Sequence, residues 1–259
     1  MTERRDESAF LAAYREQRWP SPSVAVDLVV FTVLDTDLKV LLIRRGEPPF
    51  TGAWALPGGF VRVGDAFDDR GESLAAAAAR ELGEETGLDP QAVFLEQLYT
   101  FGAPDRDPRM RVLSVAHYAL VRPTLAPLVT AGTDAAAARW VSVASEIETP
   151  DPAGRLELAF DHAEILACAL ARIRGKIDYA PIAFELVPES FTIAELRSVY
   201  EALKGTSYDA GNFRRRFNRM LADGVIVQAP GKRTTGTKPA RVYRFAPMPG
   251  PSPLGAPRA

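Results

Sequence analysis

Three glutamates within one turn of a predicted helix constrain this chain more than any other feature of its sequence. Glu81, Glu84 and Glu85 are spaced i, i+3 and i+4, so a helix places their carboxylates on one face. Like charges at this spacing destabilise a helix, and Gly83 between them costs roughly 1 kcal/mol relative to alanine. A divalent cation removes the repulsion, and Mg²⁺ prefers oxygen ligands that it shares with substrate phosphates. The pattern therefore predicts a metal-and-phosphate site; an isolated glutamate pair would more simply be a solvated acidic face.

The sequence around this helix predicts an α+β or mixed-sandwich fold. Asp35-Thr36-Asp37 separates two β-rich runs as in a hairpin, and Ser73 is expected to cap the glutamate helix, which ends before Gly87. A second helix is expected to close at Gly175. The predicted elements are strands 24–34, 38–45 and 54–61, helix 73–85, strands 93–100, 112–121 and 138–143, and helix 161–173.

The charge balance of the chain changes near Lys176. Residues 176–246 carry 12 Lys/Arg against 7 Asp/Glu, a net charge of +5, whereas the whole chain has a net charge of -2. Thr192 and Glu195 form a capping box at the start of a helix. Helices over 182–186, 192–203 and 210–222, followed by strands over 225–229 and 240–245, give the order of a winged helix-turn-helix. We therefore divide the chain into a lead-in (1–22), a first domain (23–175), a DNA-binding domain (176–246) and a Pro/Gly-rich tail (247–259) expected to be disordered.

Residues 209–246 hold nine Lys/Arg against two Asp/Glu, so the positive charge gathers on the second helix and the wing. Basic side chains contact phosphates, and Arg and Asn read base edges in the major groove of double-stranded DNA. A solvated basic helix or a protein contact is the alternative. The candidate DNA contacts are Asn212, Arg214, Arg215, Arg216, Arg219, Lys232, Arg233 and Lys238.

Composition excludes several other classes. With a single cysteine, Cys168, and two histidines, the chain has no disulfide framework and no Cys/His metal centre. No apolar run reaches the roughly 20 residues of a membrane span, and the N-terminus is too charged for a secretory signal. We expect a protein of the reducing cytoplasm with no membrane partner. His162, at a helix start, is interpreted as a capping residue.

The glutamate helix resembles the Nudix box, G-x5-E-x7-R-E-U-x-E-E-x-G-U, where U is apolar. Glu72, Arg80-Glu81-Leu82, Glu84-Glu85 and Gly87-Leu88 match its second half in full. Its first half departs: Ala66 stands at the glycine position, and Gly59 fits only if residues 65–71 are an insertion.

The resemblance implies specific roles around the box. Glu81, Glu84 and Glu85 would bind Mg²⁺ or Mn²⁺, with Glu72 and Arg80 completing the catalytic set, and Gly58 and Gly59 would bind ligand. Hydrolysis stays open, with weak or absent turnover favoured because the insertion interrupts the loop before Glu72.

Downstream of the box, Pro104 lies sixteen residues after Leu88, the spacing of ADP-ribose-type Nudix proteins. Arg106 and Arg109 follow it and could contact the diphosphate, although solvated loop arginines are an equal alternative.

The second domain resembles the NrtR type of Nudix-related transcriptional regulators of NAD metabolism. Residues 179–188 (YAPIAFELVP), 191–196 (FTIAEL) and 212–216 (NFRRR) carry this resemblance. It implies a Nudix fold (an α/β/α sandwich with a mixed sheet) followed by a winged helix, a homodimer on operator DNA, and ADP-ribose as effector of a repressor of NAD synthesis or salvage genes.

Two alternatives remain for the function. The first is a Mg²⁺-dependent pyrophosphatase that cleaves ADP-ribose to AMP and ribose 5-phosphate, with the winged helix accessory. The second is a regulator of the same architecture with another sugar phosphate as inducer.

Overall fold

A computed structural model of the chain describes Phe10, Tyr14 and residues 21–64, 70–129, 135–150, 156–234 and 239–246. Most of the expected lead-in, most of the insertion, Lys238 and the expected disordered tail lie outside these residues. Within them, a mixed seven-stranded sheet is followed by a two-stranded sheet, so the predicted α+β class is confirmed.

The large sheet is built on a hairpin. Strand β1 (Ser23–Leu34) pairs with the antiparallel β2 (Asp37–Arg45), and Asp35 and Thr36 between them have φ of 50° and 64°. Two successive positive φ values are the geometry of a type I′ turn, whose twist matches that of the strands. The sheet order is β3-β2-β1-β6-β5, with β4 paired to β1 and β7 to β2. The remaining strands are β3 (Trp54–Ala55), β4 (Gly58–Phe60), β5 (Phe94–Phe101), β6 (Val112–Leu120) and β7 (Ala135–Ser142).

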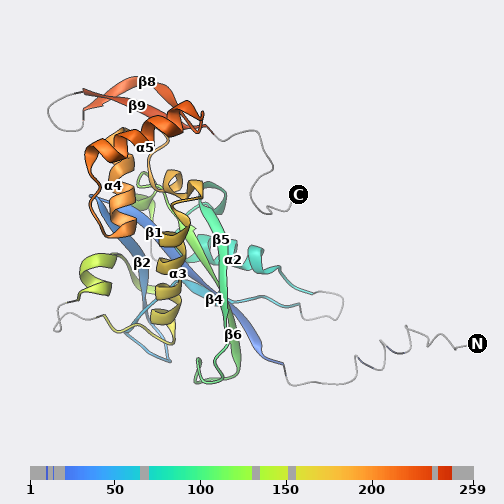
Figure 1. Ribbon diagram of the computed structural model, residues 1–259. Helices are drawn as coiled ribbons and strands as arrows, with labels where there is room; N and C mark the ends of the chain where they lie inside the picture. The colour runs from blue at the N-terminus through green and yellow to red at the C-terminus, as the bar shows by residue number, and fades with distance from the viewer. Residues whose placement is uncertain are drawn as a thin grey trace, which may run out of the picture.

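Helices cover both faces of this sheet, because alternate residues of the central strand β1 are apolar on both sides. Leu28 and Val30 pack with Leu82 of helix α2 (Leu74–Thr86). Val29 and Phe31 pack with helix α3 (His162–Lys176). The result is the expected α/β/α sandwich, with α3 on one face of the sheet and α2 on the other (Figure 1).

Helix α3 is longer than the sequence predicted. Gly175 lies inside it, and the Ile177 N–H donates to the Ile173 carbonyl over 3.0 Å. The predicted stop at Gly175 is wrong because this glycine does not adopt the left-handed conformation of a helix end. Short helical segments η1 (Pro90–Ala92), η2 (Ala126–Leu128), η3 (Val143–Glu148) and η5 (Pro181–Leu186) connect the larger elements.

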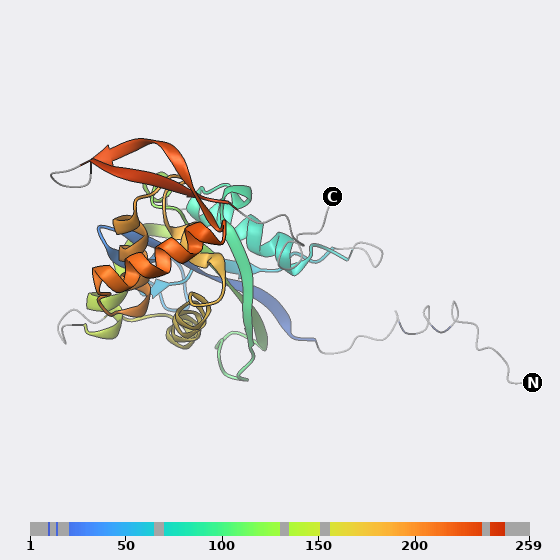
Figure 2. The ribbon, with the colours of Figure 1, turned by 45° about the horizontal axis from the view of Figure 1, so that its top comes forward.

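The C-terminal elements form a winged helix. They are α4 (Ile193–Lys204), α5 (Ala210–Ala222), β8 (Ile226–Thr234) and β9 (Pro239–Phe245). The predicted capping box is confirmed: Thr192 Oγ1 accepts from the Glu195 N–H over 3.2 Å, and Glu195 Oε2 from the Thr192 N–H over 2.6 Å. The β8–β9 hairpin lies beside α5 at one end of the molecule (Figure 2).

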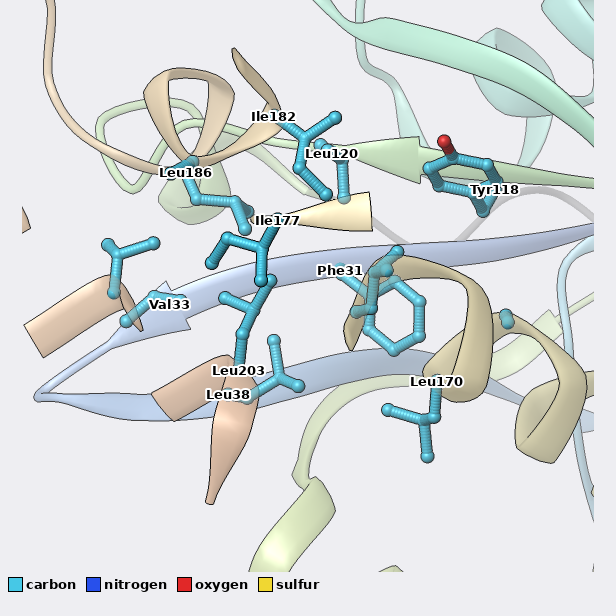
Figure 3. Close-up of a cluster of buried hydrophobic side chains, with 14 of the residues drawn as sticks. Phe31, Val33, Leu38, Tyr118, Leu120, Leu170, Ile177, Ile182, Leu186 and Leu203 are labelled. Atoms are coloured by element: carbon cyan, nitrogen blue, oxygen red, sulfur yellow. The ribbon is translucent and has the colours of Figure 1, made fainter. Parts of the chain in front are cut away.

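One hydrophobic core joins the sandwich to the winged helix. Val33 and Leu38, at the tip of the β1–β2 hairpin, belong to the same buried cluster as Leu203 of α4 (Figure 3). Ile177 and Ile182, from the connection between the domains, fill the space around them. Burying a large aliphatic side chain contributes roughly 1.5–3 kcal/mol, so the winged helix is packed against the sandwich and is not merely tethered to it.

Candidate functional site

The glutamate helix begins and ends as its sequence predicts. Ser73 Oγ accepts from the Ala76 N–H, and Gly87, at φ 71°, donates its N–H to the Gly83 carbonyl. Leu82 and the alanines at 77 and 78 are buried, which turns the glutamate face of α2 toward β4. The packing of the apolar face thus sets the direction of the acidic one.

Arg80 is the centre of the acidic cluster. Its guanidinium binds both Glu72 oxygens, at 2.6 and 3.0 Å, and also lies 2.6 Å from Glu81 Oε1 and 2.9 Å from Glu84 Oε2. The hydrogen bonds from Arg80 and from the Arg62 N–H lower the pKa of Glu72 to about 2. Glu72 is therefore held ionised.

The insertion does not displace Glu72. The Glu72 N–H donates to the Arg62 carbonyl over 3.0 Å, and the Arg62 N–H donates to Glu72 Oε1 over 2.8 Å. These two bonds join Arg62 to Glu72 on either side of the insertion, and Glu72 stays beside Arg80.

The three metal-ligand candidates point to different partners. Glu81 is buried against Gly59, and this burial raises the pKa of Glu81 while Arg80 lowers it. Glu84 is half exposed and binds Arg62 over 2.9 Å, whereas Glu85 accepts from the Gly58 N–H over 2.8 Å. Among the described residues no three His, Cys, Asp or Glu side chains form a group that could hold a metal ion. The expected convergence of the three carboxylates is thus not present in this conformation, because the arginines and the Gly58 N–H occupy them separately.

A cleft lies next to this cluster. Glu85, Gly58, Gly59 and Phe60 line one side of it, and the loop after β5 lines another. Its further lining residues include Asp27, Arg45, Glu47, Leu56, Arg106, Asp107, Arg109, Phe160 and His162. The structure therefore brings the two glycines, Glu85, Arg106 and Arg109 of the predicted site together. Pro104 is exposed and is not among the lining residues.

The floor of the cleft is a buried charge network centred on Asp27. Asp27 accepts from Ser114 over 2.5 Å and from Arg106 over 3.2 Å, and lies 3.4 Å from His162 Nε2. Burial alone would raise the pKa of Asp27, but His162, Ser114 and Arg106 outweigh it and lower that pKa to about 2. Arg106 also binds both oxygens of Asp161, at 2.6 and 2.8 Å. Arg106 is thus committed to two carboxylates.

Arg109 differs from Arg106 in being partly exposed. Its side chain is 41% exposed, and Asp107 holds it at 2.7 and 3.0 Å. Its guanidinium lies 5.4 Å from the ring centroid of Phe60 and 5.9 Å from that of Phe160. Arg45 covers Phe160 at 5.0 Å. The cleft therefore presents a partly exposed guanidinium beside the aromatic rings of Phe60 and Phe160. A cation of this kind is chemically suited to phosphate.

His162 does not cap the helix, contrary to the interpretation from sequence. Asp161 is the N-cap residue, and His162 Nδ1 accepts from the buried Leu56 N–H over 2.9 Å. The side chain turns into the cleft because this N–H and Asp27 lie there. Asp27 and Phe160 were not singled out from the sequence either, although an aspartate inside the apolar run 24–34 is a recognisable signal.

A second candidate surface lies on the winged helix. Helix α5 buries Phe213 and Phe217 and exposes three of its four arginines, Arg214, Arg215 and Arg219. Arg233 of the wing is drawn back to Glu195, at 2.8 and 2.9 Å, and to Ser190. Arg216 is half-buried. The predicted DNA contacts that are exposed are Asn212, Arg214, Arg215, Arg219 and Lys232.

Known proteins combine the same two parts. The family model of the NUDIX domain matches residues 24–165, and the family model of the NrtR DNA-binding winged helix domain matches residues 183–245. The ADPR responsive transcriptional repressor NtrR of Acinetobacter baylyi is 35% identical over 240 residues, which span 93% of this chain and 88% of that protein.

Solved structures are also similar to this chain. Shewanella oneidensis NrtR, in a crystal structure with a 27mer DNA, has a TM-score of 0.70 and 32% identity over 86% of this chain and 93% of its own. The NUDIX domain of the same protein, solved with ADP ribose, has a TM-score of 0.50 and 29% identity over 67% of this chain and 99% of its own. A Nudix domain followed by a DNA-binding winged helix is the class that the fold and both surfaces define. The chain belongs to the NrtR family of Nudix-related transcriptional regulators.

Proposed function

We propose that this protein is an ADP-ribose-responsive transcriptional repressor of NAD synthesis or salvage genes. The winged helix binds double-stranded operator DNA, and the Nudix domain binds ADP-ribose in the cleft beside α2. The observation that carries the proposal is the shared hydrophobic core of the two domains. Through this contact a change at the cleft would reach the DNA-binding surface. A relative named as an ADPR-responsive repressor supports this assignment.

The ligand-binding part rests on the chemistry of the cleft. ADP-ribose carries a diphosphate and an aromatic base, and the cleft presents Arg109 together with Phe60 and Phe160. Gly58 and Gly59 bring the backbone close to Glu85 and Glu81 on the side where a diphosphate-bound cation would sit.

The cation would be Mg²⁺ or Mn²⁺. Three carboxylates are a donor set that suits a hard divalent ion, and Glu81, Glu84 and Glu85 would hold it. When bound, such an ion neutralises diphosphate charge. The part of this chain is to hold the three carboxylates on one face of α2 through the packing of its buried side. Glu81 and Glu84, which bind Arg80 in this structure, would have to exchange it for the cation.

The DNA-binding part rests on the exposed residues of α5 and the wing. Their phosphate contacts would set the register, and Asn212 or an arginine would read bases. Operators of such proteins are two-fold symmetric, so we also propose a homodimer. No helix among the described residues has both the length and the apolar character to cross a membrane. We propose the cytoplasm as its location.

The test is selection of genomic DNA fragments on the immobilised protein, followed by elution with ADP-ribose and Mg²⁺. Discrete fragments released by intact ADP-ribose, from genes of NAD metabolism, are the expected result. If no fragment is retained and AMP accumulates in the eluate, the protein is an enzyme and not a repressor.

Hydrolysis of ADP-ribose is the second candidate function. It is favoured by one observation: Glu72 and Arg80 stay in contact in spite of the insertion, so the box is intact around α2. The two functions are compatible, because slow turnover would remove the effector after it has acted.

A further inference from the structure

We propose that helix α3 transmits occupation of the cleft to the winged helix, with Arg174 and Arg216 as positioning residues at its C-terminal end. The inference rests on the proposed function, since it concerns how ADP-ribose binding alters DNA binding. It is carried by the contacts at the two ends of this one helix.

The N-terminal end of α3 is part of the cleft. Asp161, its N-cap, binds Arg106 over 2.6 Å, and His162 accepts from the Leu56 N–H over 2.9 Å. Phe160, just before the helix, lines the cleft beside Arg109. A ligand that engages this wall therefore acts directly on the first turn of α3.

The body of α3 can carry such a displacement. Its 15 residues span about 22 Å at 1.5 Å per residue. Ile165, Leu166 and Ile173 are buried against the sheet, and Leu170 lies in the same cluster. Sliding of a packed helix as a rigid unit is a common mode of conformational change.

The C-terminal end of α3 holds the first helix of the winged helix. Arg174 Nε donates to the Leu203 carbonyl, in the last turn of α4, over 2.9 Å. The terminal nitrogens of Arg174 bind Glu148 over 2.5 and 2.9 Å, which fixes the guanidinium. This carbonyl has no partner within its own helix, so Arg174 supplies the missing donor.

The segment directly after α3 holds the second helix. Asp178 binds Lys204 over 2.6 Å and lies 3.5 Å from Arg216 on α5. The Arg216 guanidinium also lies 4.5 Å from the ring centroid of Tyr200 and 3.3 Å from its hydroxyl. Arg216 thus faces the domain junction, whereas its neighbours Arg214 and Arg215 are exposed. This role differs from the DNA contact that the sequence pattern suggested for Arg216.

The first test compares Arg174→Ala with Arg172→Ala on the full chain. Arg172 is on the same helix but binds the Leu98 carbonyl of β5 over 3.1 Å, away from the winged helix. The quantity measured is the ratio of DNA dissociation constants with and without saturating ADP-ribose, with Mg²⁺ present. We expect a ratio in the range of about 5–150 for the parent and Arg172→Ala, and one near 1 for Arg174→Ala. ADP-ribose affinity of Arg174→Ala without DNA should stay within about threefold of the parent.

The second test separates positioning from DNA contact at α5. Loss of one phosphate contact lowers the slope of log K against log salt by about 1. Arg214→Ala should lower this slope and keep the ADP-ribose response, while Arg216→Ala should keep the slope and lose the response. The reverse result for Arg216 would make it a DNA contact and overturn its proposed role.

These outcomes are distinguishable from failure of the proposed function. If ADP-ribose leaves the DNA affinity of the parent unchanged, the proposed function itself is wrong. If the parent responds and both Arg174→Ala and Arg216→Ala respond equally, only the role of α3 is wrong. If Arg174→Ala does not fold, the ADP-ribose response of Arg216→Ala alone tests the role of α3.

Discussion

Gly59 lies directly against the carboxylate of Glu81. A Cβ at position 59 would stand 2.3 Å from Glu81 Oε1 and 2.7 Å from Cδ, well inside van der Waals contact. Arg80 holds the same carboxylate over 2.6 Å, so it cannot turn away without losing an ion pair. The glycine turn and the glutamate helix are therefore fitted to one another at the point where diphosphate and cation would meet.

This fit makes Gly59→Ala informative. We expect the substitution to displace Glu81 and to weaken Mg²⁺-dependent ADP-ribose binding by at least tenfold, which is about 1.4 kcal/mol. Titration calorimetry with and without Mg²⁺ measures the effect. Unchanged affinity with Mg²⁺ would show that Glu81 takes no part in ligand binding.

Gly83→Ala on helix α2 is the matched control. A Cβ there meets no atom closer than 3.7 Å, which is ordinary contact. Because alanine is favoured over glycine in a helix interior, we expect the free energy of unfolding to rise by roughly 0.5–1 kcal/mol with ligand binding retained. A lower melting temperature would mean that the backbone at position 83 needs glycine.

Stability at low pH depends on Asp27. Its pKa in the folded protein is about 2, below the ordinary value of 3.8, so it stabilises the fold above pH 4 and this contribution is lost as the pH falls toward 2. The difference corresponds to about 2 kcal/mol. Asp27→Asn should lower stability at pH 7 and flatten its decline between pH 4 and 2, as measured by urea unfolding. An unaltered decline would locate the acid sensitivity elsewhere.

The exposed face of α5 gives a prediction for DNA binding. Arg215→Ala should weaken binding to a selected DNA fragment and reduce the salt slope by about 1, since Arg215 is exposed and no buried partner holds it. Fluorescence anisotropy over a series of salt concentrations measures both quantities, and calorimetry should give unchanged ADP-ribose affinity. DNA affinity equal to that of the parent would exclude Arg215 from the interface.

Turnover, where it is detected, should depend on Glu85. This residue lines the cleft and accepts from the Gly58 N–H over 2.8 Å. Glu85→Gln should reduce AMP formation from ADP-ribose by at least 10²-fold, because catalysis depends on exact placement of the reacting groups. Chromatography of the products checks this. Equal AMP formation by parent and variant would refute a metal-assisted mechanism at this helix.

Much of the fold could be predicted from local sequence because its signals are local. Ser73, Gly87 and the Thr192–Glu195 capping box mark helix ends through contacts a few residues apart, and all lie where expected. Gly175 shows the limit: a glycine after a helical run suggests a stop, but the packing of Ile173 and Ile177 carries α3 past it.

The site was less predictable, because its partners come from distant segments. Arg106 and Arg109 look equivalent in sequence, yet the two aspartates at 27 and 161 engage the first and leave the second at the surface. The same holds for Arg216, whose partners Asp178 and Tyr200 lie 38 and 16 residues away. Which arginine stays at the surface, within reach of a ligand, is a property of the tertiary structure.

The most direct test of the central claim is an anisotropy titration of a labelled, genome-selected DNA fragment with the full chain, with and without ADP-ribose and Mg²⁺. The account predicts that saturating ADP-ribose raises the DNA dissociation constant by about 5–150-fold, and that DNA weakens ADP-ribose binding by the same factor. Equal DNA affinity in both conditions, with ADP-ribose shown to be bound, would contradict it.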